Sequence, residues 1–137
     1  MTSLNHSRWK PQGPIEISVP SGPGGGTDHS ARVMQKILQQ RHLLEVPVNI
    51  VNKPGGGGLA ALNYLQQYHG NAHFVQTASA ILLTNHIVGR SMVNYTDLTP
   101  IALLQSEYVV HAVKSDSPVR TLGDLVARRN SLTGTRP

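Results

Sequence analysis

The chain has 137 residues, of which 39% are hydrophobic, and it contains one Trp, one Phe and no Cys. This length fits one domain with an aliphatic core, the lack of Cys excludes disulfides and thiolate metal sites, and no run reaches the roughly 18 apolar residues of a membrane span. The formal net charge is +5, but basic and acidic residues balance across residues 14–125. A nucleic-acid surface gathers its basic residues on one face, so this interpretation is disfavoured. The excess positive charge lies at the two ends: Arg8, Lys10, Arg128, Arg129 and Arg136.

The first ordered stretch is predicted to be a strand, a glycine-rich turn and a helix. Residues 1–13 are polar and aperiodic, so we expect a disordered tail. Residues 16–19 alternate as a strand does, and a turn with four glycines follows Pro20. A helical pattern then begins behind Thr27 and Asp28. Thr27, Asp28 and Ser30 are the candidate caps of this helix.

Strand and helix patterns continue to alternate along the chain. A second strand is predicted over residues 46–51, a helix from Leu59 to Gly70, a third strand over residues 74–77 and a helix over residues 81–88. This order indicates an α/β fold with a largely parallel sheet. Farther on, residues 108–113 are predicted to form another strand. Residues 121–124 have the spacing of a capping box and open a final helical turn.

The glycine turn at residues 19–28, VPSGPGGGTD, is the strongest candidate for a binding site. It places backbone N–H groups and the positive end of a helix at one spot, which suits an anion. It lacks the Lys of a phosphate-binding P-loop, because Thr27 and Asp28 follow Gly26. Thr77 and Ser79 end a strand where open α/β sheets bind ligands. The alternatives are ordinary turn chemistry for both loops and a plain helix cap for Asp28.

A second glycine run, at residues 55–58, formally matches a dinucleotide-binding pattern through Gly55, Gly57 and Ala60. No acid between Glu45 and Asp97 is available to hold a ribose, so a structural turn is the favoured interpretation. The seven His residues show no metal-site spacing, and no Ser lies in a nucleophile elbow. The sequence therefore indicates neither an enzyme, nor a metal site, nor a cofactor.

Five segments, in this order and at this spacing, resemble the substrate-binding proteins of tripartite tricarboxylate transporters, the Bug/TctC-type extracytoplasmic solute receptors. The resemblance covers about residues 14–127. The segments are VPSGPGGGTDHSARVM, VNIVNKPGGGG, QTAS, YTDLTPIALL and DSPVRTLGDLVA.

The resemblance implies a type II periplasmic-binding fold, with two α/β lobes and a ligand cleft between them. It also implies that the protein captures a small carboxylate through backbone amides and bound waters and delivers it to membrane transporter subunits. It implies no catalysed reaction. The family usually has an aromatic residue where this chain has Ser21. The ligand-binding residues that the resemblance implies are Pro20, Ser21, Gly22, Pro23, Gly24, Gly25, Gly26, Thr27, Asp28, Thr77, Ala78 and Ser79.

The chain is less than half as long as the family implies, so we expect the first lobe only, with a parallel-rich sheet flanked by helices. On this interpretation, residues 14–107 form lobe I, residues 108–114 cross between the lobes, and residues 115–137 begin a truncated lobe II. We expect such a chain to bind weakly, because one wall of a cleft does not enclose its ligand, and to self-associate through uncovered sheet surface.

Two function hypotheses follow. The first is a solute-binding component that captures a di- or tricarboxylate or an amino acid. The second is an interaction or orphan α/β domain in which the glycine loops are only turns. Family resemblance implies a periplasmic location, whereas the absence of a signal peptide from the sequence implies a cytoplasmic one for the chain as given.

Overall fold

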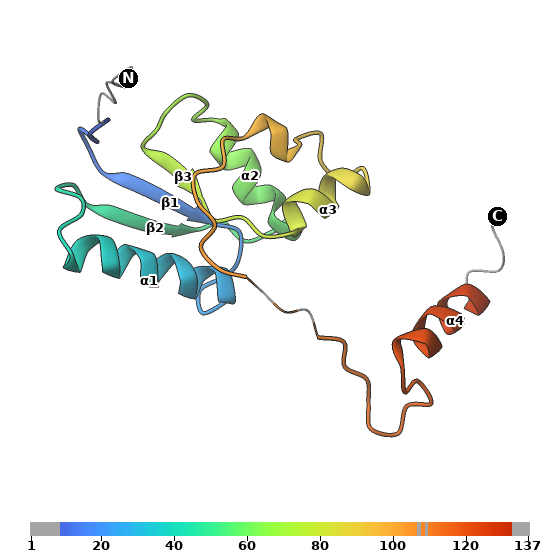
Figure 1. The fold of residues 1–137 in the computed structure, drawn as a ribbon. Coiled ribbons are helices and arrows are strands. Elements are labelled where there is room, and N and C mark those ends of the chain that lie inside the picture. The colour runs from blue at the N-terminus through green and yellow to red at the C-terminus, as the bar shows by residue number, and fades with distance from the viewer. Residues whose placement is uncertain (1–8, 107, 109, 133–137) are drawn as a thin grey trace, which may run out of the picture. The chain divides into compact units, whose positions relative to one another are not determined.

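In a computed structural model, the structure describes residues 9–106, 108 and 110–132. Contacts divide the chain into two units, Met1–Ala102 and Leu103–Pro137. The helices and strands of the first unit are β1 (Ile15–Val19), α1 (Gly26–Gln40), β2 (Val48–Asn52), η1 (Gly56–Gly58), α2 (Leu59–Gln66), β3 (Phe74–Gln76), α3 (Ile81–Ile87) and η2 (Tyr95–Asp97), and α4 (Leu122–Leu132) lies in the second (Figure 1).

A parallel three-stranded sheet of order β2-β1-β3 organises the first unit. From β1 the chain crosses to β2 through α1, and from β2 it crosses back over to β3 through α2. Because such crossovers are right-handed and run in opposite directions, α1 and α2 lie on opposite sides of the sheet (Figure 1). The α/β fold with a parallel sheet flanked by helices, predicted from the sequence, is thereby confirmed.

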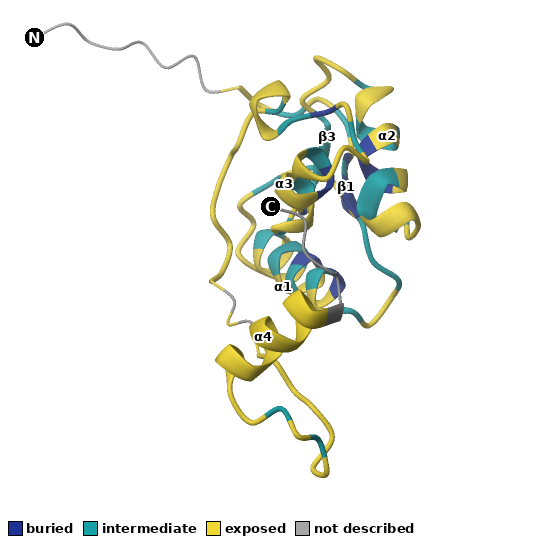
Figure 2. Cartoon of the chain, turned by 90° about the vertical axis from the view of Figure 1, so that its right-hand side faces the viewer, coloured by how far each residue is buried: buried dark blue, intermediate teal, exposed yellow. Residues whose placement is uncertain are grey.

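The core is centred on β1. Ile15, Ile17 and Val19 are buried together with Ala31 of α1 and Val48 of β2. Figure 2 shows the buried residues gathered on β1 and on the inward sides of α1 and α2. Burial on both faces is what a parallel sheet between two helix layers requires, and it accounts for the burial of four of the five residues of β1, Ser18 included.

Aromatic side chains fasten α2 to the sheet on the other side. Tyr68, in the turn that follows α2, stacks on Phe74 of β3, with ring centroids 3.7 Å apart. The Tyr64 hydroxyl donates a hydrogen bond of 2.7 Å to Glu16, which raises the pKa of Tyr64. Lys53 lies over the Tyr64 ring, 4.1 Å from its centroid. Tyr64 of α2 therefore contacts both β1 and the residue that follows β2.

The start of α1 differs from the sequence prediction, and the described end of the expected tail makes contacts. The described part of the expected tail contacts the sheet side, since the Gln12 N–H donates to His73 at 3.2 Å and Trp9 packs edge-on against the same ring; residues 1–8 lie outside the described residues. The N-cap of α1 is Gly25, without a side-chain cap. None of the three candidate caps, Thr27, Asp28 and Ser30, caps the helix. The Asp28 carboxylate accepts its hydrogen bonds from Gly24, Arg32 and Asn52 instead.

The second unit contains α4. It also includes residues 108–113, for which the sequence predicted a strand. Thr121 and Asp124 form the predicted capping box, with hydrogen bonds of 2.8 and 3.1 Å. The helix continues to Leu132, well beyond the single turn expected. Tyr108 and residues 110–113, the part of the predicted strand that the structure describes, are not in a strand. A strand needs a paired neighbour, and the described residues of the second unit include no strand that could pair with this segment.

Among the described residues, no helix has both the length and the apolar character needed to cross a membrane.

The central position of β1 generates a stability prediction. Ile17→Ala removes a side chain that is 1% exposed, so we expect the free energy of unfolding to fall by about 2–5 kcal/mol. The control is Ile87→Ala on α3, where the same side chain is 79% exposed and the change should stay within about 0.5 kcal/mol. Urea denaturation followed by circular dichroism measures both. Equal losses would contradict a core centred on β1.

Candidate ligand-binding site

Three loops meet at one edge of the sheet. Because β1, β2 and β3 are parallel, their carboxyl ends lie together, and so do the loops that follow them at residues 20–25, 53–58 and 77–80. The chain departs from β1 toward β2 on one side and returns to β3 on the other. Open α/β sheets bind their ligands in the crevice that such a divergence creates.

A cavity of about 240 Å³ lies among these loops. It is lined by all three of them and by the start of α3. Its lining offers hydroxyl groups, glycine backbone and apolar carbon, but no Asp, Glu, Lys or Arg among the described residues. The lining residues are Pro20, Ser21, Thr27, Gly55, Gly57, Gly58, Ser79 and Ile81.

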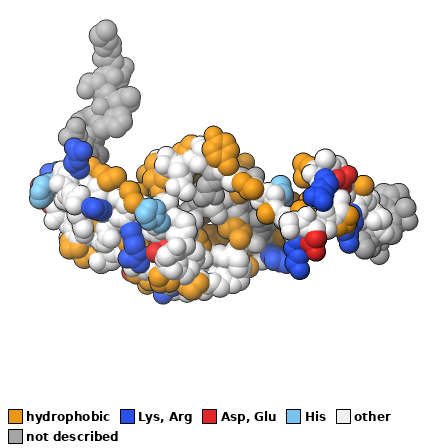
Figure 3. Space-filling view, turned by 90° about the horizontal axis from the view of Figure 1, so that it is seen from below, with side chains coloured by type: hydrophobic (Ala, Val, Ile, Leu, Met, Phe, Trp, Pro, Cys, Tyr) orange, Lys and Arg blue, Asp and Glu red, His pale blue; other side chains and the backbone are white. Residues whose placement is uncertain are grey.

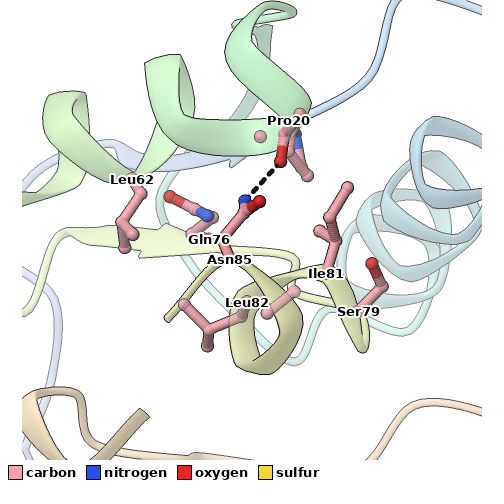
Figure 4. A pocket seen from close by; sticks show the side chains of 10 residues that line it. Pro20, Leu62, Gln76, Ser79, Ile81, Leu82 and Asn85 are labelled. Carbon is pink, nitrogen blue, oxygen red and sulfur yellow. Dashed lines mark hydrogen bonds between the residues drawn. The ribbon is translucent and has the colours of Figure 1, made fainter. Parts of the chain in front are cut away.

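A narrow recess of about 10 Å³ adjoins this cavity. Figure 4 shows its side chains: Gln76 extends from the end of β3 between Leu62 of α2 and Asn85 of α3. Ile81 and Leu82 close it on the α3 side. The recess shares Pro20, Gly57, Gly58, Ser79 and Ile81 with the larger cavity, so the two form adjoining parts of one site.

The buried carboxylate of Asp28 fixes the first glycine loop. Asp28 is 1% exposed, and it accepts hydrogen bonds from Arg32 at 2.9 Å, the Gly24 N–H at 2.8 Å and Asn52 at 2.9 Å. These donors, the Arg32 bond first, hold the pKa of Asp28 well below its ordinary value. Gly24 has φ +83°, a conformation that glycine adopts without strain. The carboxylate is therefore occupied within the protein.

Asn52 links the first loop to the end of β2. Its amide nitrogen donates to the Ser21 carbonyl at 2.9 Å as well as to Asp28, and its oxygen accepts from Arg32 at 3.3 Å. Asn52 ends β2 and holds the loop that follows β1. The position of this loop therefore depends on the pairing of the two strands as well as on the turn itself.

The first loop presents neutral donors to the cavity. Ser21 and Thr27 lie in its lining and their hydroxyl groups are hydrogen-bonded to each other at 2.6 Å. The first turn of α1 adds backbone N–H groups that have no intrahelical partners, and its N-cap Gly25 supplies no side-chain bond. Together with the helix dipole, this end of the site favours a negatively charged group without offering a cationic side chain.

The second glycine loop packs against α3 and forms one wall of the site. Gly57 and Gly58 have φ of +62° and +92°, and a Cβ on Gly58 would lie 3.5 Å from carbons of Pro20 and Ile81. Asn85 of α3 donates to the Gly57 carbonyl at 2.7 Å. The sequence favoured a purely structural turn here, but the loop also lines the cavity.

The third loop divides into a buried residue and two that line the site. Both the N–H and the hydroxyl of Thr77 face the Ser18 carbonyl, at 3.0 and 3.5 Å, so Thr77 extends the sheet and lies in neither lining. Ala78 and Ser79 line the recess, and Ser79 also lines the cavity.

The predicted site residues therefore fall into two groups, those that line the cavity or the recess and those that do not. Those that line the site are Pro20, Ser21, Thr27, Ala78 and Ser79. Those that lie outside both linings are Gly22, Pro23, Gly24, Gly25, Gly26, Asp28 and Thr77. Sequence reasoning missed the lining residues Gly55, Gly57, Gly58, Leu62, Gln76, Ile81, Leu82 and Asn85. Two signals were available in the sequence: the second glycine run follows a strand, and Gln76 opens the segment QTAS. No signal pointed to α3.

Comparisons with known proteins identify relatives of the whole arrangement. The chain is 30% identical, over 126 residues, to a UPF0065 protein of Bordetella pertussis; the match covers 90% of this chain and 38% of that protein. Its structure matches the ligand-free crystal structure of a TctC solute-binding protein from Polaromonas with a TM-score of 0.64 and 28% identity, over 88% of this chain and 41% of that one. The chain is thus similar to solute-binding proteins of the Bug/TctC type.

The chain thus spans about two fifths of the length of these relatives, which agrees with a single lobe of the Bug/TctC fold. No protein-family model matches it. The residues that the structure describes contain no group of three or more His, Cys, Asp or Glu side chains placed to hold a metal ion.

The Asp28 network generates a pH prediction. A carboxylate whose pKa is lower in the folded than in the unfolded state stabilises the fold above the unfolded value, about 3.9, and this contribution is lost as the pH falls toward the folded value. We expect Asp28→Asn to reduce the loss of stability below about pH 4. Urea midpoints measured from pH 6 to pH 2 test this. The exposed Asp116→Asn controls for net charge, and identical pH profiles of the two variants would contradict the network.

A second prediction concerns Asn52. Asn52→Ala removes the donor to Asp28 and to the Ser21 carbonyl, so we expect the free energy of unfolding to fall by about 1–3 kcal/mol. The matched control is Asn49→Ala on the same strand, where the side chain is exposed. Denaturant unfolding measures both variants. If Asn49→Ala proved as costly as Asn52→Ala, the link between the loops would not contribute.

Proposed function

We propose that this chain carries the ligand-contacting loops of a solute-binding component of a tripartite tricarboxylate-type transport system. The observation that carries the proposal is the 240 Å³ cavity at the carboxyl ends of three parallel strands. Its walls supply hydroxyl groups, glycine backbone and the start of α1. The relatedness to solute-binding proteins supports the same assignment.

The chemistry of the lining favours a small carboxylate. Hydrogen bonds to an ionised group contribute about 1.5–3 kcal/mol each, and a helix N-terminus adds up to about 1 kcal/mol, so neutral donors suffice to hold an anion. We assign this contact to Ser21, Thr27, Ser79 and the backbone of the first and second glycine loops. Asp28 serves the site by fixing the loop.

The remaining parts of the proposal rest on the relatives. We propose an extracytoplasmic receptor that delivers its ligand to membrane transporter subunits without chemical change. In the described residues β2 and β3 are the outer strands of the sheet, and we propose that these edges promote self-association.

The alternatives find less support. In a domain with purely structural glycine turns, the hydroxyl groups of Ser21, Thr27 and Ser79 would have no reason to line one cavity. A nucleic-acid surface would gather its basic residues, whereas Lys and Arg are scattered over the face seen in Figure 3 and lie among acidic and apolar side chains.

An NMR titration tests the proposal. We expect malate, citrate, aspartate or glutamate to shift the backbone amides of Ser21, Thr27, Ser79 and residues 55–58, with a dissociation constant in the millimolar range, equivalent to about −4 kcal/mol. The weak affinity follows from a site that does not fully enclose its ligand.

Matched variants locate the response. Ser79→Leu fills the cavity and should abolish the shifts, whereas Ser106→Leu, an exposed position in the second unit, should leave them unchanged. A folded chain that responds to none of the four carboxylates would sink the proposal.

A further inference from the structure

The imidazole ring of His73 anchors the described end of the N-terminal segment. His73 lies in the turn before β3 and is partly buried. Its Nε2 accepts a hydrogen bond of 3.2 Å from the Gln12 N–H, and the Trp9 ring packs edge-on against it, with ring centroids 5.5 Å apart. Residues 9–12 are therefore fastened to this turn through a group that titrates near neutral pH.

The hydrogen bonds around this ring define which of its nitrogens carries the proton. A backbone N–H can only donate, so the Nε2 that faces Gln12 must be unprotonated. The side-chain oxygen of Asn71 accepts the backbone N–H of His73 at 3.0 Å, and the same oxygen lies 3.2 Å from Nδ1. Nδ1 therefore carries the proton and donates to Asn71. Both bonds of the ring form together only when the imidazole is neutral.

Protonation of His73 breaks the bond to Gln12 and spares the other contacts of the turn. In the imidazolium ion both ring nitrogens are donors, so an Nε2–H group would face the Gln12 N–H with no acceptor between them. The bond to Asn71 survives, because Nδ1 keeps its proton. The backbone link to β1 survives too, since the Glu16 N–H donates to the His73 carbonyl at 2.8 Å. The loss therefore falls on residues 9–12.

The surroundings of the ring offer no counter-charge that would take over from the Gln12 bond. The titratable residues of the segments packed around it, namely the N-terminal segment, β1 and the turn after α2, are Lys10, Glu16, Tyr68 and His69. Glu16, the acid among them, accepts the Tyr64 hydroxyl instead. Among the described residues, none of the four side chains forms a hydrogen bond or ion pair with the imidazole.

We propose that His73 is a pH-sensitive latch for the N-terminal segment: neutral His73 holds residues 9–12 against the turn before β3, and protonated His73 releases them. Histidine changes its charge between about pH 8 and pH 5, so the segment is held at pH 8 and released at pH 5. The latch lies at the amino end of β3, whereas the candidate ligand-binding site lies at the carboxyl ends of the strands. The inference therefore goes beyond the proposed function and does not depend on it.

NMR and fluorescence on the unmodified chain test the latch. At pH 8 the ring-nitrogen signals of His73 should show Nδ1 protonated and Nε2 unprotonated, and the Gln12 amide proton should move upfield as His73 titrates toward pH 5. The released population should rise about two- to tenfold, the effect of one hydrogen bond, so acrylamide should quench Trp9, the one Trp of the chain, more strongly. An Nε2–H group at pH 8, a Gln12 signal that does not follow His73, or unchanged or weaker quenching at pH 5 would overturn the proposal.

Matched variants then assign the response to His73. His73→Gln replaces the imidazole by an amide that does not titrate, so the quenching of Trp9 should no longer change between pH 8 and pH 5. His69→Gln removes an exposed histidine from the turn after α2 and should keep the full response. A folded His73→Gln chain that still releases Trp9 at pH 5 would refute the assignment, and so would loss of the response in His69→Gln.

Discussion

The parallel pairing of β1 with both β2 and β3 is the constraint on which the rest of the site depends. A strand with parallel neighbours on both sides forces its two crossovers onto opposite faces and brings three strand ends to one edge. The buried side chains of Ile17 and Val19 supply the burial that holds this arrangement. The cavity is thus a consequence of the sheet topology, and the loops only give it its chemistry.

Asp28 connects the first glycine loop to the sheet, because it binds both Gly24 and Asn52. An acidic residue beside a proposed anion site would repel the ligand if its charge were free. Here the charge is neutralised by Arg32 and shared with Gly24 and Asn52, so its effect is to draw the end of β2 and the glycine turn together. The groups of the cavity lining that remain are neutral hydroxyl and N–H donors, as the proposed carboxylate contact requires.

The relatives give this arrangement its context. The match covers nearly all of the present chain and about two fifths of each relative, and the matched part contains all three loops of the candidate site. The exposed apolar side chains of the second unit, such as Tyr108 at 96% and Val110 at 82%, belong to the region where a strand was predicted. Their pattern is that of a strand, yet a strand forms only beside another.

The sequence by itself determined the order and type of the elements in the first unit, the α/β class, and the resemblance to Bug/TctC-type receptors. These properties follow from local periodicity, from turn residues and from motifs in a fixed order. Each of these signals can be recognised without knowing which distant residues come into contact. Tertiary structure alone decided that Asp28 and Thr77 bond internally, that Gly57 and Gly58 line the cavity, and that α3 closes it over Gln76. Each of these depends on a partner some distance away in the chain, such as Asn52 for Asp28 and Ser18 for Thr77, and such pairings arise only when the strands align.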